Sequence, residues 1–105
     1  MPEETVHATG TEPFWNALVS GGDMQYSQPD DPDGQTVAVS RFAGRGGVSF
    51  SGRLQDQDLV LAVTDARCTD GMSERSYPFT ATLRIGDVLQ SGCAWTQRRP
   101  YTGGE

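Results

Sequence analysis

The sequence contains no lysine, a single histidine and no long apolar run, and each shortage excludes a class of function. Its only strong cations are 8 arginines, which face 14 Asp and Glu residues and leave a net charge of -6. Phosphate binding depends on clustered cations, so we do not expect nucleic acid as a partner. No stretch approaches the ~18 apolar residues that a membrane-spanning helix needs.

The scarcity of bases and metal ligands argues against enzyme chemistry. A nucleophilic serine such as Ser73 needs a neighbouring base, and without lysine the chain offers only His7. The opening residues 1–8 are polar, so we expect a frayed arm in which His7 is solvated. One histidine, three methionines and two cysteines make a poor zinc site, and the spacing of His7, Met24 and Met72 does not support a copper site. We expect a non-enzymatic protein with no cofactor and no metal.

The low apolar content predicts one small domain. Hydrophobic residues make up 35% of the 105 residues and glycine contributes 13, so the core needs support from a cross-link or a closed sheet. Cys68 and Cys93 supply the cross-link if they pair, which favours an oxidising compartment; two free cytosolic thiols are the alternative. We expect a single domain over residues 1–105, ordered from about 9 to 97, with polar ends.

Alternation of apolar and polar residues between turn signals predicts an all-β fold. The clearest case is 77–85, in which the odd-numbered residues are apolar, and 59–63 is apolar on both faces, as in an inner strand. The expected strands are 14–19, 24–26, 35–42, 48–54, 59–63, 77–85 and 88–96. Because closure protects strand edges, we expect an antiparallel β-barrel-like meander of seven or eight short strands, with an open β-sandwich as the alternative.

Two polar segments allow more than one interpretation. Residues 28–34 carry three aspartates, as a calcium loop does, but Pro32 and the lack of a downstream bidentate Glu break that pattern. We interpret this segment as a solvated turn. Residues 68–77 form a loop that a disulfide would pin to the closing strand, with a helical turn capped by Thr69 or Asp70.

The candidate binding site combines aromatic surface with a few fixed polar groups, the usual composition of a small-ligand site. Its residues are expected at one end of the barrel: Glu12, Trp15, Asp70, Met72, Arg75 and Tyr77. Core packing is the competing interpretation for the two aromatic residues. A salt bridge from Arg67 or Arg75 is the competing interpretation for Glu12.

Three motifs carry a resemblance to a known family: Gly10-Thr11-Glu12-Pro13-Phe14-Trp15, Cys68-Thr69-Asp70-Gly71-Met72-Ser73-Glu74-Arg75-Ser76-Tyr77-Pro78-Phe79 and Gly92-Cys93-Ala94. The chain from Gly10 to Trp95 resembles bacterial envelope proteins described as uncharacterised membrane proteins or lipoproteins. The resemblance implies a periplasmic or membrane-anchored setting, with any acylated cysteine upstream of Met1, and it implies no established activity. In size and paired cysteines the chain is also similar to C-type lysozyme inhibitors and META-domain proteins, although it carries no motif that matches theirs.

These observations lead us to expect a periplasmic or envelope-associated binding or maintenance module. We expect a monomer whose partner is a small molecule or an envelope protein, with peripheral membrane association through an N-terminal anchor outside this chain. One alternative is an inhibitor of host lysozyme, a basic enzyme toward which an acidic protein would be steered. The other is a carrier of a small ligand or metal, with a lumen lined by Phe, Trp and Met.

Overall fold

Nine antiparallel strands form one sheet in the computed structural model, in the order β4-β3-β2-β1-β9-β8-β7-β6-β5. The structure describes residues 5–11, 14–29, 31–44, 46–69 and 75–103. The strands are β1 (Val6–Thr11), β2 (Phe14–Ser20), β3 (Asp23–Gln28), β4 (Asp31–Ala38), β5 (Ser40–Gly44), β6 (Gly47–Leu54), β7 (Gln57–Thr64), β8 (Phe79–Ile85) and β9 (Val88–Thr96). The predicted all-β, barrel-like fold is confirmed. The described residues contain no helix long and apolar enough to cross a membrane.

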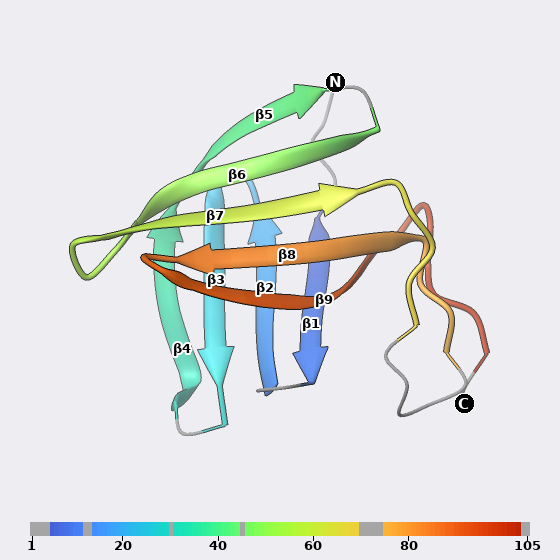
Figure 1. The fold of residues 1–105 in the computed structure, drawn as a ribbon, viewed down its shortest axis with the longest axis horizontal. Coiled ribbons are helices and arrows are strands. Elements are labelled where there is room, and N and C mark those ends of the chain that lie inside the picture. Colours follow the sequence, from blue (N-terminus) through green and yellow to red (C-terminus); the bar gives the residue numbers. More distant parts are fainter. Residues whose placement is uncertain (1–4, 12–13, 30, 45, 70–74, 104–105) are drawn as a thin grey trace.

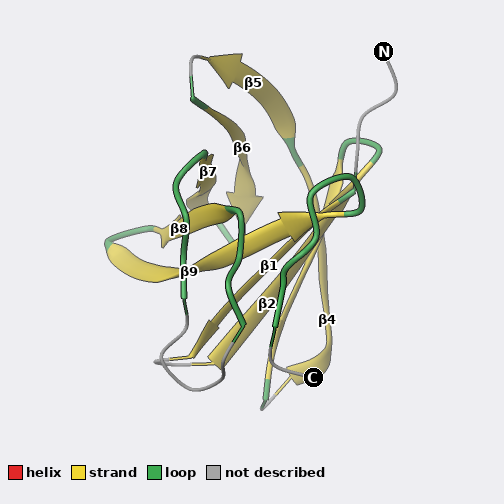
Figure 2. Ribbon diagram, turned by 90° about the vertical axis from the view of Figure 1, so that its right-hand side faces the viewer, coloured by secondary structure: helices red, strands yellow, loops and turns green. Residues whose placement is uncertain are grey.

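The sheet curls until its two ends approach each other. Figure 1 shows β1–β4 running nearly at right angles to β6–β9, so that the two halves face one another across the core. The chain passes from β4 to β5, the two ends of the hydrogen-bonded order, through Val39 alone. The Val39 amide donates to the Gly22 carbonyl at 2.9 Å, and β4 also packs against β6. The result is a nearly closed barrel from which the β5–β6 hairpin rises, as Figure 2 shows.

The interior is filled by inward-facing side chains from eight of the nine strands. Successive side chains of a strand point to opposite faces, so alternate residues enter the core. The buried apolar residues are Val6, Ala8, Trp15, Ala17, Val19, Met24, Tyr26, Val37, Phe50, Leu59, Leu61, Val63, Ala81, Leu83 and Ala94. The faces predicted for 77–85 are confirmed at Ala81 and Leu83, and β7 is flanked by β6 and β8 as its apolar faces indicated.

β9 joins the two halves at a corner. Cys93 pairs with Thr9 of β1 on one side and with Thr80 of β8 on the other. At the preceding position a Cβ atom would meet the Thr9 carbonyl oxygen, so only glycine, here Gly92, lets the two strands approach this closely. This corner brings the outer face of β1 beside the loop that follows β7.

Both ends of the chain are more ordered than the sequence predicted. The expected frayed arm is wrong from Val6 onward, because β1 pairs with β2 and with β9. The expected disorder of 97–105 is wrong at Thr102, which forms a bridge with Ser76 through hydrogen bonds of 2.8 and 2.9 Å. In each case one stabilising partner is distant in sequence: β9 for β1, and Ser76 for Thr102. The strands number nine because β1 is added and 35–42 is divided between β4 and β5.

The turn within the acidic segment 28–34 is shorter than predicted. β3 continues to Gln28 and β4 already begins at Asp31, so most of 28–34 belongs to a strand pair. The register shifts between Tyr26 and Gln28, and Gly34 adopts a φ of 76° beside this irregularity. The helical turn predicted around Asp70 falls on residues 70–74, which lie outside the described residues.

Candidate functional site

A disulfide fixes the loop after β7 to the outer face of the barrel. Cys68 and Cys93 are bonded, with 5.5 Å between their Cα atoms, as the sequence predicted. Cys93 points outward from β9 and is nevertheless buried. The disulfide is compatible with an oxidising, extracytoplasmic location.

Two short bridges extend this attachment to the C-terminal segment. The Cys68 amide donates to the Tyr77 carbonyl at 2.9 Å, and the Tyr77 amide donates to the Cys68 carbonyl at 2.7 Å. The neighbouring Ser76 pairs with Thr102. Tyr77 and Tyr101 are therefore held beside the outer face of β9 by backbone contacts rather than by their rings alone.

Four rings and one guanidinium form a continuous row, which we call the aromatic wall. His7 stacks on Trp95 with ring centroids 4.0 Å apart and an interplanar angle of 5°. Tyr101 meets Trp95 edge to face, with ring centroids 5.3 Å apart. The rings of Tyr101 and Tyr77 are tilted by 48°, with centroids 5.6 Å apart. The guanidinium carbon of Arg75 lies 4.3 Å from the centroid of the Tyr101 ring. Contacts of this kind hold each ring in place without a ligand, so the wall is pre-organised.

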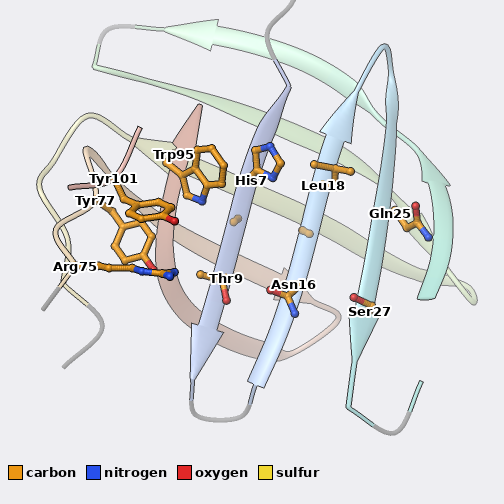
Figure 3. Close-up of a pocket in the computed structure, with 12 residues that line it drawn as sticks. His7, Thr9, Asn16, Leu18, Gln25, Ser27, Arg75, Tyr77, Trp95 and Tyr101 are labelled. Atoms are coloured by element: carbon orange, nitrogen blue, oxygen red, sulfur yellow. The ribbon is translucent and has the colours of Figure 1, made fainter. Parts of the chain in front are cut away.

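The outer faces of β1, β2 and β3 supply a floor beside this wall. His7 pairs with Leu18 and Leu18 with Gln25, which sets one row across the strands. The second row, the polar row, consists of Thr9, Asn16 and Ser27, which are paired in the same way. Figure 3 shows both rows on the sheet and the Arg75 side chain extending toward Thr9.

The wall and the floor enclose a groove with a volume of about 570 Å³. Small-ligand sites commonly span roughly 300–1,000 Å³. A cavity at the mouth of the barrel, lined by Val48, Phe50 and Phe79 among others, has about 260 Å³. The cavities beside Cys68 and beside Arg67 have about 420 Å³ each. The interior, where a carrier would hold its cargo, is filled by Trp15, Met24 and other side chains of the core.

The groove has an electrostatic character unlike that of the whole chain. Among the described residues that line it there is no carboxylate, and Arg75 is the one with a formal charge at neutral pH. Burial lowers the pKa of His7, because partial removal from water penalises the charged imidazolium. The chain carries a net charge of -6, whereas the described lining of the groove carries no negative charge.

The residues predicted for the site fall into three groups. Arg75 and Tyr77 line the groove, although Tyr77 itself is buried, with 3% of its surface exposed. Trp15 faces inward with 1% of its surface exposed, which agrees with core packing. Glu12, Asp70 and Met72 lie outside the described residues, and so does any Glu12 salt bridge. Of the arginines considered for that bridge, Arg67 donates from Nε to the Ser76 hydroxyl at 2.7 Å.

The sequence did not indicate that His7, Trp95, Tyr101 and the residues of the floor would line the site. His7 and Thr9 alternate with Val6 and Ala8, a weak strand signal that would have placed both polar residues on one outer face. For Tyr101 the sequence offered no comparable signal, because its position depends on the bridge between Ser76 and Thr102.

The described residues contain no group of three or more His, Cys, Asp and Glu that could hold a metal ion. The described residues that line the groove offer hydrogen-bonding groups, aromatic surface and the guanidinium of Arg75. No protein-family model, no curated protein and no solved structure matches this chain.

Proposed function

We propose that this protein is a non-enzymatic binding module of the bacterial envelope that holds a small polar ligand in the groove. The observation that carries the proposal is the pre-organised groove itself, in which a stacked aromatic wall stands beside the polar row. Side chains that are already ordered lose little conformational freedom when a ligand binds. The Cys68–Cys93 disulfide supports the choice of an oxidising compartment, of which the periplasm is the one we propose.

The lining of the groove favours binding over catalysis. General acid–base chemistry needs a group whose pKa lies near the working pH and a second group to exchange the proton with. His7 is the one described lining residue of this type, and its nearest ring partner is Trp95, which cannot take a proton. The described residues of the groove can therefore recognise a ligand, but they do not include a pair of groups that could exchange a proton with it.

A ligand screen with a blocked groove tests the proposal. Compounds are screened by NMR, with the Trp95 indole N–H as reporter, because this ring lines the groove. Asn16→Tyr places a ring on an exposed position at the middle of the floor and should abolish binding. Ser20→Tyr places the same ring on an exposed, outward position of β2 outside the groove and should leave binding unchanged.

Two results would contradict the proposal. One is a screen in which no compound shifts the Trp95 signal; the other is binding that survives in Asn16→Tyr. Native mass spectrometry of protein isolated from its own cells gives an independent readout. A retained ligand would appear as extra mass in the native spectrum and disappear after denaturation.

A further inference from the structure

The cavity at the mouth of the barrel has the lining of a second ligand site. We infer that this cavity takes a small monocarboxylic acid with an apolar body, such as a medium-chain fatty acid. The cavity shares no lining residue with the groove, so the inference goes beyond the proposed function. Two features of the described lining carry it: an apolar wall and a guanidinium at its edge.

The apolar wall is built from four strands of the barrel. Its side chains are Val6 of β1, Val48 and Phe50 of β6, Val63 of β7 and Phe79 of β8. The cavity has a volume of about 260 Å³. An apolar cavity of roughly 150 Å³ can hold a benzene molecule, so this one has room for a somewhat longer apolar body.

Backbone contacts fix the edge of the cavity at the β5–β6 hairpin, which rises from the barrel in Figure 2. The Gly46 carbonyl accepts a hydrogen bond from the Asp65 amide at 2.6 Å, and this bond joins the hairpin turn to the segment after β7. At Gly47 a Cβ atom would meet the Val63 carbonyl oxygen, so glycine allows β6 and β7 to lie this close. Because the backbone is already fixed here, little conformational freedom is lost when a ligand binds.

Arg41 places a positive charge at the edge of the apolar wall. It pairs with the buried Phe50 across the β5–β6 hairpin, and directly paired residues share a face of the sheet. Arg41 is nevertheless exposed, and no described residue forms a hydrogen bond or an ion pair with it. A guanidinium can bind a carboxylate through two parallel hydrogen bonds. A carboxylate at Arg41 could thus stay close to water while the apolar body enters the cavity.

The second charged residue of the lining, Asp65, already faces a cation. Its Oδ1 atom lies 3.5 Å from Nη1 of Arg99. The Arg99 guanidinium also lies over the ring of Phe79, 4.8 Å from the centroid. Among the described residues, this edge of the cavity therefore carries two guanidiniums and one carboxylate. Such a balance favours an anionic head group over a cationic one.

The test is a titration of the whole chain, followed by NMR of the Val48 and Val63 methyl groups, which line the cavity. We expect octanoate to bind with a Kd of about 0.1 mM and hexanoate to bind about fourfold more weakly for each methylene that it lacks. Octan-1-ol, which has no charge, should bind about threefold more weakly than octanoate, because an exposed ion pair contributes little. Octylammonium should bind more weakly still. Nuclear Overhauser effects from Val63 to the terminal methyl of octanoate should place the chain without any substitution.

Matched variants assign the recognition to residues. Val48→Phe fills the cavity and should abolish octanoate binding, whereas Val60→Phe makes the same change on the outer face of β7 and should leave binding unchanged. Arg41→Gln should weaken octanoate about threefold and leave octan-1-ol unchanged. Arg84→Gln removes the same charge from an exposed position of β8 outside the cavity and should have no effect. The melting temperature of each variant confirms that it is folded.

The outcomes distinguish the site from the head group. Affinity that does not depend on chain length, or the lack of Overhauser effects to Val63, would overturn the cavity as the site even if Val48→Phe did not fold. Equal affinity for octanoate and octan-1-ol, with no loss in Arg41→Gln, would overturn the carboxylate. Tighter binding of octylammonium would overturn it in favour of a cation beside Asp65.

The groove variant keeps this inference separate from the proposed function. Asn16→Tyr should block ligands of the groove and leave octanoate binding unchanged, because Asn16 does not line the cavity. Octanoate binding that is lost in Asn16→Tyr and kept in Val48→Phe would overturn the inference by placing the acid in the groove.

Discussion

Closure of the barrel should depend on a glycine on β6. At Gly52 a Cβ atom would meet the Ala38 carbonyl oxygen and would lie 3.0 Å from Val37 Cγ1 and 3.2 Å from Val39 Cγ1. These atoms belong to the end of β4 and to Val39, which links β4 to β5 where the two ends of the sheet approach each other. The carbonyl is backbone, so it cannot rotate away as a side chain would. Gly52→Ala should therefore push β6 away from the end of β4, where the barrel closes.

The expected cost follows from the cost of overpacking a tight contact, which is about 2 kcal/mol. For a domain of this size that corresponds to a fall in melting temperature of about 10 °C. Gly44→Ala is the matched control, because Gly44 lies on the partner strand β5, lacks a positive φ and has nothing within 4 Å of its ideal Cβ. The control should be neutral or stabilising by about 0.5 kcal/mol, since alanine restricts the unfolded chain.

Urea and thermal unfolding, followed by far-ultraviolet circular dichroism, measure both variants. Gly52→Ala should be less stable than Gly44→Ala by about 2–3 kcal/mol, the overpacking cost plus the gain of the control. Equal stabilities would refute it, because they would mean that β6 does not press against the β4–β5 passage in solution.

Two further predictions concern the disulfide and the histidine. Cys68→Ala with Cys93→Ala should lower the free energy of unfolding by about 3.5 kcal/mol, from loop closure over a sequence separation of 25; a loss below about 1 kcal/mol in urea titrations would contradict this. The pKa of His7 lies below its ordinary 6.5 because of burial, so on acidification the unfolded chain takes up the proton first and stability falls. The melting temperature should thus decrease as the pH drops through about 6.5 toward the folded pKa. His7→Gln should remove this component, and an NMR midpoint at or above 6.5 would refute it.

The strand faces were predictable because they depend on local alternation. In 77–85 every second residue is apolar, and the same residues enter the core at Ala81 and Leu83. Between the expected strands 14–19 and 24–26 the structure has a hairpin turn at Gly21 and Gly22, and both adopt the positive φ that glycine permits. The disulfide followed from the count of cysteines, because two thiols allow one intramolecular pairing.

The candidate site was only partly predictable because its parts come together across the sheet. Arg75 and Tyr77 were recognised from the composition of their loop, but Trp15, which was expected beside them, faces the core. Their partner in the structure is Tyr101, in a tail that composition predicted to be disordered. Polar residues at a chain end show no periodicity that would indicate a distant hydrogen-bond partner. Here Thr102 has such a partner in Ser76.

By itself the sequence determined the fold class, the acidic charge and the covalent link between the loop after β7 and the strand β9, because these depend on residue type and short-range pattern. Only the tertiary structure decided that β1 enters between β2 and β9. That insertion puts His7 beside Trp95 and Thr9 beside Asn16. Strand order in a sheet is fixed by the burial of all faces at once, a property that no local segment of the chain encodes.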